Sequence, residues 1–319
     1  MRKIYSQLLV ILFLNISVFK AQDSLVATLL GHSGPVNSIA ISPDNKWLIS
    51  GSKDETLRLW NLNDFSNAKT ISNFGYSIKR VDFNSKGDKF LVATYEIFSE
   101  FDFIKFKKIR TKKNAHTTFL ENCAYSPNDE FIVSSSWRDK TLVVWKASSL
   151  KKQSETIEVT WVDNAIFNKA STLIVSCGHD DMIKIWDVAT GGLIKQFAGH
   201  EDWVYDICLS IDEKYIYSAS LDKTIKIWDI ASGKQISTLK GHTDGVVSID
   251  ISKDGKYLAS AGLGKEIIIW DLTSKTIVKK FPAHDLTIMD VKFGNNSNTL
   301  YSASMDKTIK IWKFNLPTN

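Results

Sequence analysis

The sequence predicts an all-β fold in which seven four-stranded antiparallel blades form a ring. The first observation is a repeat of about 42 residues: tryptophans at the same place in successive units are separated by 85, 41, 42, 42 and 42 residues, and the first interval equals two periods. The phased tryptophans are Trp60, Trp145, Trp186, Trp228, Trp270 and Trp312. Residues 24–316 therefore hold seven units and leave no room for a second domain.

The second observation is an alternation of apolar and polar residues within each unit. Residues 215–220 and 224–228, for example, alternate with period two and are rich in aromatic and β-branched side chains, and the turn residues 221–223 separate them. This pattern is typical of short strands joined by tight turns. Four such strands fit each unit, and a neighbouring blade is needed to cover the apolar face of each sheet.

Two recurring dipeptides resemble those of the WD-repeat β-propeller family. Glycine–histidine pairs begin three units, at His32, His200 and His242, and tryptophan–aspartate pairs end three units, at Trp186, Trp228 and Trp270. The resemblance covers the whole segment 22–319, which we expect to be a single propeller domain.

The resemblance also implies a buried polar network in each unit. The indole N–H of the tryptophan, a serine ten residues before it, an acid six residues before it and the phased histidine can satisfy one another's hydrogen bonds. The residues expected in this network are His32, Ser50, Asp54, Trp60, His116, Asp139, Trp145, Trp186, His200, Ser218, Asp222, Trp228, His242, Trp270, His284, Asp306 and Trp312. The same spacing predicts Ser135 for the third unit.

Three units depart from this pattern. The second has Asn73, Tyr95 and Phe101 at the positions of the histidine, the acid and the tryptophan, the fourth has Glu158 for the histidine, and the sixth has Gly264 for the acid. We expect packing rather than the polar network to hold these blades, and we expect the second blade to be the weakest.

The two ends of the chain are predicted to meet. Only seven residues follow Trp312, too few for an outer strand, whereas residues 24–30 resemble the outer strand at 235–240 that precedes the next glycine–histidine pair. The N-terminal strand is therefore expected to close the ring by completing the seventh blade, which also removes an exposed edge.

The first 21 residues read as a secretory signal. A basic start at Arg2 and Lys3 is followed by an apolar segment at 8–14 and by Ala21, after which cleavage is expected. The alternative is a membrane anchor, but the apolar stretch is shorter than the roughly 20 residues that a bilayer requires. We therefore expect an exported protein, in the periplasm, at the cell surface or in the medium, with no integral membrane segment after cleavage.

The histidine and cysteine content argues against an enzyme and against a metal or cofactor site. Five of the six histidines are at the phased position, and the sequence has no glycine-rich phosphate loop and no nucleophile-elbow motif. Cys177 and His179 are two possible zinc ligands where four are needed. We expect no cofactor and no metal, and we expect Cys123, Cys177 and Cys208 to be reduced and buried. A propeller hydrolase with a site built from channel residues is the least favoured alternative.

One strongly basic run, Lys105–Lys113, has two interpretations. Its six positive charges in nine residues could bind an anion, or they could protect an outermost strand from edge-to-edge pairing. The formal net charge of the whole chain is only +5, so the composition does not indicate a nucleic-acid partner.

The resemblance implies that the mouth of the central channel on one face, called the top, binds a protein or peptide. The positions that would line it in blades one, three and four include Asn37, Lys53, Arg138, Trp161, Asp163 and His179. In blades five to seven they are Trp203, Tyr205, Leu221, Val247, Leu263, Met289 and Met305. This second group is apolar and is the predicted partner-binding site, because contiguous exposed apolar surface marks interfaces.

The function predicted from the sequence is therefore an exported, non-enzymatic interaction scaffold that is monomeric on its own. The alternative is an exported module that binds a glycan or a small ligand, in which aromatic side chains would lie beside Asp and Asn in a narrower pocket.

Overall fold

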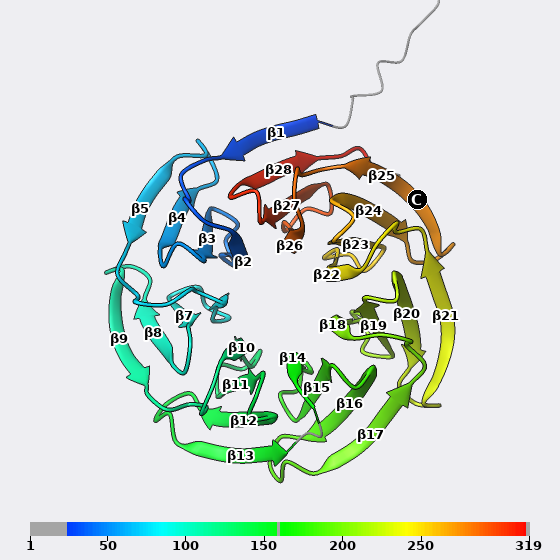
Figure 1. Cartoon of the computed structure of the whole chain (residues 1–319), viewed down its shortest axis with the longest axis horizontal. Helices are drawn as coiled ribbons and strands as arrows, with labels where there is room; N and C mark the ends of the chain where they lie inside the picture. The colour runs from blue at the N-terminus through cyan, green and yellow to red at the C-terminus, as the bar shows by residue number, and fades with distance from the viewer. Residues whose placement is uncertain (1–23, 158–159, 317–319) are drawn as a thin grey trace, which may run out of the picture.

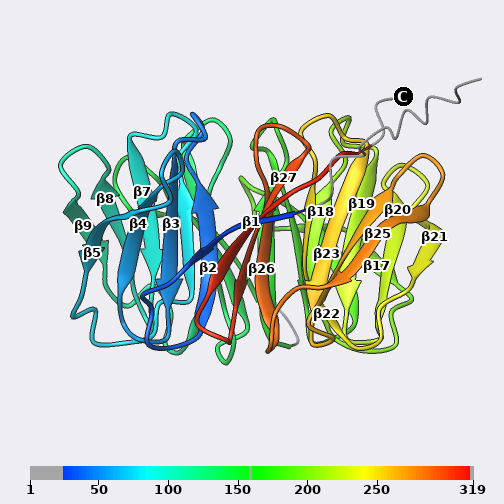
Figure 2. The ribbon, with the colours of Figure 1, turned by 90° about the horizontal axis from the view of Figure 1, so that it is seen from above.

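The computed structural model describes residues 24–157 and 160–316, which form a ring of seven blades around a central channel (Figure 1). Each blade is a separate four-stranded sheet whose neighbouring strands are antiparallel, and the described residues contain no helix. Seen from the side, the ring is a disc with the blade strands running between its two faces (Figure 2). The predicted fold class is confirmed, whereas the predicted signal at residues 1–21 lies outside the described residues.

The strands of the first four blades are given from the channel outward. Blade one consists of β2 (Val36–Ile41), β3 (Trp47–Ser52), β4 (Leu57–Asn61) and β5 (Asn67–Ile71). Blade two consists of β6 (Arg80–Phe83), β7 (Lys89–Ala93), β8 (Phe98–Asp102) and β9 (Lys107–Lys112). Blade three consists of β10 (Leu120–Tyr125), β11 (Phe131–Ser136), β12 (Thr141–Lys146) and β13 (Lys152–Ile157). Blade four consists of β14 (Val162–Phe167), β15 (Leu173–Gly178), β16 (Met182–Asp187) and β17 (Leu193–Ala198).

The remaining three blades follow the same order. Blade five consists of β18 (Val204–Leu209), β19 (Tyr215–Ser220), β20 (Thr224–Asp229) and β21 (Lys234–Lys240). Blade six consists of β22 (Val246–Ile251), β23 (Tyr257–Gly262), β24 (Glu266–Asp271) and β25 (Thr276–Pro282). Blade seven consists of β26 (Ile288–Phe293), β27 (Thr299–Ser304), β28 (Ile309–Lys313) and β1 (Ser24–Leu29).

The N-terminal strand closes the ring, as the sequence predicts. Strand β1 pairs with β28 in antiparallel register, from Ser24 opposite Lys313 to Leu29 opposite Ile309. Figure 1 shows β1 lying along the outside of blade seven. Leu29 also belongs to the apolar cluster shared by blades seven and one, so the closing strand is held by packing as well as by its ladder.

The apolar core lies between neighbouring blades rather than at the centre of the ring. One cluster, for example, joins Tyr217 and Ile225 of blade five to Val246 and Trp270 of blade six. Each sheet therefore buries its apolar face against the next sheet, which is how a repeat with no core of its own becomes stable.

Carboxylates in the channel wall connect successive blades. Asp82 Oδ2 accepts a hydrogen bond from the backbone N–H of Tyr125 at 2.8 Å, and Asp206 Oδ2 accepts one from the N–H of Ile249, also at 2.8 Å. Asp290 Oδ2 accepts another from the N–H of Ile39 at 2.9 Å, across the junction between blades seven and one. These bonds satisfy buried backbone donors and fix the spacing of the blades around the channel.

None of the described residues forms a helix long and apolar enough to cross a membrane.

Candidate interaction surface at the top mouth

The polar network is complete in blade five. His200 Nδ1 lies 2.7 Å from Asp222 Oδ2, and its Nε2 lies 2.7 Å from Ser218 Oγ. The indole of Trp228 donates to the same Ser218 oxygen at 2.8 Å. These contacts assign the histidine proton to Nδ1, because the carboxylate can only accept, so that Nε2 accepts from the serine hydroxyl.

The same arrangement recurs in blades one, three and seven. In each, one serine hydroxyl joins the indole to the histidine, and an aspartate holds the other ring nitrogen. The residues are His32, Ser50, Asp54 and Trp60; His116, Ser134, Asp139 and Trp145; and His284, Ser302, Asp306 and Trp312. Burial lowers the pKa of His32 and His284 and keeps these rings neutral, as the network requires.

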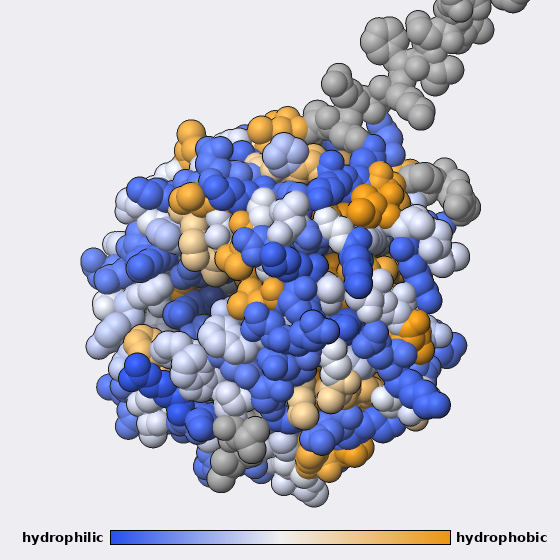
Figure 3. All heavy atoms as spheres, turned by 45° about the vertical axis from the view of Figure 1, so that its right-hand side comes forward, coloured by the Kyte–Doolittle hydropathy of each residue, from blue (hydrophilic) through white to orange (hydrophobic). Residues whose placement is uncertain are grey.

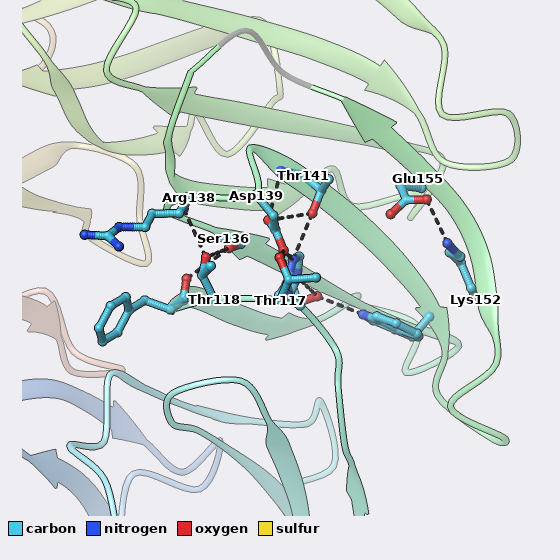
Figure 4. Close-up of polar contacts among 12 residues, drawn as sticks. Thr117, Thr118, Ser136, Arg138, Asp139, Thr141, Lys152 and Glu155 are labelled. Atoms are coloured by element: carbon cyan, nitrogen blue, oxygen red, sulfur yellow. Dashed lines mark hydrogen bonds and ion pairs between the residues drawn. The ribbon is translucent and has the colours of Figure 1, made fainter.

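Blade three uses Ser134, not the expected Ser135. Ser134 Oγ lies 2.8 Å from both His116 Nε2 and Trp145 Nε1, whereas Ser135 Oγ is buried without a hydrogen-bond partner. Counted between the last paired residues, the β11–β12 hairpin (Ser135 to Leu142) is one residue longer than the β3–β4 hairpin (Gly51 to Leu57), which shifts every residue counted back from the tryptophan. Figure 4 shows Asp139 facing Thr117 and Thr141 and the Arg138 side chain extending away from them.

Blade six has an acid in its network after all, although Gly264 occupies the expected position. Glu266, two residues later, accepts a hydrogen bond from the backbone N–H of Thr243 at 2.9 Å and lies 3.6 Å from His242 Nδ1. Its longer side chain reaches the place that aspartate fills elsewhere. The sixth blade is therefore joined by a variant of the network, and burial lowers the pKa of His242 to about 4.

Blade four keeps only part of the network. Trp186 donates to Ser176 Oγ at 2.8 Å. The turn acid, Asp180, is paired with the buried amine of Lys184. Glu158, which stands at the position of the histidine, lies outside the described residues.

The top face brings a loop residue and a hairpin residue of each blade together. Leu221 N donates to Trp203 O, and Met305 N donates to Thr287 O, both at 2.9 Å. Leu221 and Leu263 lie on either side of Gly245, since a methyl group there would be 2.5 Å from the first and 3.0 Å from the second. The predicted residues of blades five and six are thus neighbours on one surface.

The predicted residues differ in exposure. Trp203, Leu263 and Met305 are 37–39% exposed. Tyr205, Leu221, Val247 and Met289 are half-buried. Over the face drawn in Figure 3, apolar residues form small separate groups on a mainly hydrophilic surface, which is ordinary for a folded protein. At the top mouth, the contacts around Gly245 place Leu221 and Leu263 side by side.

A chain of aromatic rings extends this surface across blades two to five. We call it the aromatic arc, and each of its rings lies within 6.0 Å of at least one other, centroid to centroid, with both Trp203 and Tyr205 next to His179. Its members are Tyr76, Tyr95, Phe119, Trp137, Trp161, His179, Trp203 and Tyr205. The rings of His179 and Trp203 are stacked, 3.8 Å apart with 12° between their planes.

The arc adds aromatic rings in blades two to four to the apolar residues that the sequence predicts for blades five to seven. Phe119 lies three residues after His116, the same offset that selects Trp203 in blade five, and could have been found from the sequence by that rule. Trp137, rather than Arg138, holds the hairpin position of blade three, because its backbone N–H donates to Phe119 O at 3.0 Å. Counting back from Trp145 missed Trp137, because the hairpin has one extra residue.

Close contacts between polar side chains mark the polar part of the mouth. Lys79 Nζ lies 3.0 Å from Glu121 Oε1, and His179 Nε2 lies 3.0 Å from Asp163 Oδ2. Asn37 donates to the carbonyl of Ile78 at 2.7 Å. Lys53 and Arg138 are exposed.

The basic run Lys105–Lys113 contains strand β9, the outermost strand of blade two. Part of its charge is already used: Arg110 Nε donates to the buried Glu100 at 2.6 Å, and the Lys112 amine lies 4.5 Å from the centroid of the Trp145 ring. Lys105, Lys107 and Lys108 remain exposed. The strand is thus an edge of the sheet, as the protective interpretation requires.

Cysteines and histidines do not form a metal centre in the described part of the chain. No group of three His, Cys, Asp or Glu side chains there could hold a metal ion. Cys123 and Cys177 are buried free thiols, and burial raises the pKa of both. Cys208 is also free but only half-buried, which differs from the expectation of full burial.

A cavity of about 540 Å³ lies at the opposite end of the channel from the top mouth. Its wall carries both signs of charge, from Arg80, Asp82, Asp250 and Lys292. Burial raises the pKa of Asp82 to about 6. Because these carboxylates already serve the backbone of neighbouring blades, the cavity wall belongs to the framework of the ring.

Six segments of the sequence match the family WD40, described as WD domain, G-beta repeat: residues 23–61, 106–146, 149–187, 191–229, 233–271 and 275–313. The unmatched stretch, 62–105, contains three of the four strands of blade two, where the motif residues are replaced.

Several curated proteins are similar to parts of the chain. The nuclear distribution protein nudF of Aspergillus niger is 26% identical over 202 residues, which are 56% of this chain and 45% of that protein. The small ribosomal subunit protein RACK1 of Caenorhabditis elegans is 26% identical over 180 residues, 55% of each chain. The guanine nucleotide-binding protein subunit beta of Zea mays is 23% identical over 195 residues, 56% of this chain and 51% of that protein. The chain thus spans about half the length of the curated relatives it matches.

Proposed function

Because the chain belongs to the WD40 family, we propose that it is an exported, non-enzymatic scaffold that binds a protein or peptide partner at the top mouth of the propeller. The observation that carries this proposal is the contiguous surface formed by the aromatic arc and by the leucines beside Gly245. Exposed aromatic and aliphatic side chains that lie side by side are the usual anchors of protein interfaces.

The non-enzymatic part of the proposal is supported by the use of the histidines. Five of the six are buried in hydrogen bonds to serines of the framework. A general base must reach a substrate proton, and these rings are turned inward. His179 alone lies at the mouth.

The export part of the proposal is supported by the sequence of residues 1–21. The expected mature protein begins at Gln22. Mass spectrometry of the natively produced protein tests this, and a full-length form beginning at Met1 in the cytoplasm would contradict it.

Partner binding is tested at Trp203. The mature wild type and Trp203→Ala are used as baits on the extracytoplasmic fraction of the native source, and a captured partner is then titrated. We expect Trp203→Ala to cost about 2 kcal/mol, roughly a 30-fold loss of affinity, because exposed tryptophans are common hot spots. The melting temperature should change little.

The matched control is Ile236→Ala, an exposed apolar side chain on the outer strand of the same blade. It should leave partner affinity unchanged. Equal loss in both variants, or a loss of several kcal/mol in the stability of Trp203→Ala, would contradict the proposed site.

Glycan binding is a second candidate function, and one observation favours it: the rings of Trp161 and Tyr205 both lie next to His179, which is 3.0 Å from Asp163. A glycan binder would bind oligosaccharides in titrations of the purified protein and would capture no protein partner.

A further inference from the structure

Unpartnered polar atoms are concentrated at the top of blade four. Among the described residues, nine buried side-chain nitrogen or oxygen atoms have no hydrogen-bond partner, and four of them lie here. They are Asp163 Oδ2, Asp181 Oδ1 and both ring nitrogens of His179. Folded proteins rarely leave such groups unsatisfied, so a cluster of them indicates a place where something else binds.

These polar atoms lie against aromatic rings. The His179 side chain is only 6% exposed and that of Asp163 only 11%. Their nearest nitrogen and oxygen are 3.0 Å apart but do not have the geometry of a hydrogen bond. The His179 ring is 4.7 Å from the Trp161 ring and is stacked on Trp203. Trp203 remains 38% exposed, so the group borders the solvent on the side of this ring.

The local charge is negative and poorly compensated. Burial raises the pKa of Asp163. It also raises the pKa of Asp181, and the charges of Asp202 and Asp180 add to that effect. The cation of Lys79, on the neighbouring part of the mouth, is paired with Glu121 at 3.0 Å. A cation placed here would therefore gain from the carboxylates and leave the Lys79–Glu121 pair intact.

The protein's own cations cover other aromatic rings but not these. Within residues 24–157 and 160–316, lysine or arginine lies over Phe106, Trp137, Trp145 and Trp312 and over neither Trp161 nor Trp203. Arg138, for example, lies 5.5 Å from the centroid of Trp137 on the next blade. The rings at blades four and five have the carboxylates that favour a cation and lack the cation.

We propose that the top of blades four and five binds an arginine side chain of the partner, with its guanidinium between the Trp203 and Trp161 rings and the carboxylates of Asp163 and Asp181. This deepens the proposed function and rests on it. A guanidinium fits because it is planar, stacks on aromatic faces and donates hydrogen bonds in a fork that matches a carboxylate. A metal ion fits less well, since the described residues offer no group of three ligands.

The test uses the full mature chain and three blocked hexapeptides, in which glycine alternates with arginine, lysine or citrulline. Citrulline has the shape of arginine and no charge. Binding is followed by the indole N–H signals of the tryptophans in NMR. We expect the arginine peptide to bind at least tenfold more tightly than the citrulline peptide and more tightly than the lysine peptide, and to shift the signal of Trp203.

Paired variants separate local recognition from general attraction. The double variant Asp163→Asn with Asp181→Asn should bind the arginine peptide no better than the citrulline peptide. The matched control is Asp244→Asn with Asp285→Asn, which removes two exposed charges from the top face at blades six and seven. The control should lower affinity by less than twofold.

Three results would overturn the inference. They are equal binding of the arginine and citrulline peptides to the wild type, equal loss in the two double variants, and displacement of the arginine peptide by a neutral oligosaccharide such as maltohexaose. The first comparison uses only the wild type, so it stands even if a variant fails to fold. Capture of a partner that depends on Trp203 but not on Asp163 and Asp181 would overturn this inference and leave the proposed function intact.

Discussion

Blades two and five have the same four strands but are held together by different interactions. In blade five, Ser218 joins Trp228 to His200, and Asp222 orients the histidine. In blade two, Phe101 replaces the tryptophan and stacks on Phe90, 5.1 Å away with 8° between the ring planes. The comparison teaches that aromatic packing can take the place of the histidine–serine–tryptophan network within the same four-stranded blade.

The two solutions differ in what each contact provides. The rings of Phe83, Phe103 and Phe106 lie 5.5–6.4 Å from the Phe90 ring, centroid to centroid. Phe83 and Phe103 also contact each other, at 5.3 Å. These rings form a cluster with no hydrogen bond between them. Such a cluster gains stability from buried area and tolerates small displacements. A hydrogen-bonded network gains less per contact but fixes distances and orientations more strictly.

The largest expected effect is in the aromatic cluster of blade two. Phe90 is fully buried, and Phe90→Ala should lower the free energy of unfolding by about 3–5 kcal/mol because it leaves a cavity among rigid rings. Chemical denaturation of the variant measures the loss. Phe90→Leu is the control, and it should recover most of the stability. A loss below 1 kcal/mol for the alanine variant would show that aromatic packing does not hold this blade.

The next effect is a dependence on pH that blade two should not share. The pKa of His242 is about 4 in the folded protein, whereas that of an unperturbed histidine is 6.5. Between pH 4 and pH 6.5 the unfolded chain therefore binds more protons than the folded one. Stability should therefore fall as the pH decreases from about 6.5 to about 4, by about 3 kcal/mol from this residue. Urea unfolding across this range measures the slope.

His242→Gln is the control for that slope and should make it shallower between pH 6.5 and 4. Stability that rises as the pH falls through this window would contradict a neutral, buried His242.

A smaller loss is expected at the hub of blade five. Ser218→Ala removes the oxygen that both Trp228 and His200 contact, and it should cost about 2 kcal/mol because two buried groups lose a partner. Thermal or chemical unfolding measures it. Ser237→Ala, on the half-buried outer strand of the same blade, should change stability by less than about 0.5 kcal/mol. Equal effects would mean that the hub is dispensable.

The smallest expected effect is in local opening. Native-state hydrogen exchange should give β7 of blade two an opening free energy about 1–2 kcal/mol below that of β19 in blade five, since blade two lacks the link from the top loop to the hairpin. Both strands are central in their sheets and buried, which makes them a matched pair. Equal protection would show that packing and the network stabilise their blades to the same extent.

The fold was predictable because the patterns that specify it can be read along the sequence. The tryptophan spacing, the alternation and the similarity of residues 24–30 to an outer strand all read directly along the chain. The predicted network residues were wrong in the two blades whose spacing or acid differs from the other repeats. An extra hairpin residue moved the serine of blade three to Ser134, and in blade six the longer side chain of Glu266 replaced an aspartate that counting placed at Gly264.

The surface was less predictable than the framework. The aromatic arc takes its rings from loops and hairpins of four blades, so no stretch of sequence contains it. Tyr76 and Trp137 occupy positions that the repeat leaves free to vary, and Tyr95 replaces the turn acid of its blade. Periodicity predicts what is shared by all blades, whereas a binding surface depends on what each blade has of its own.

The closing strand has a consequence for the order of events during synthesis. Six blades can each form from a continuous stretch of about 40 residues, but β1, near the start of the chain, must wait for β28, near its end. Until β1 pairs with β28, blade seven has only three strands and an exposed edge, and the ring is not closed. Contacts between distant parts of a chain form slowly. Completion of the propeller is thus a late event, because β1 must remain unpaired until β28 has been synthesised.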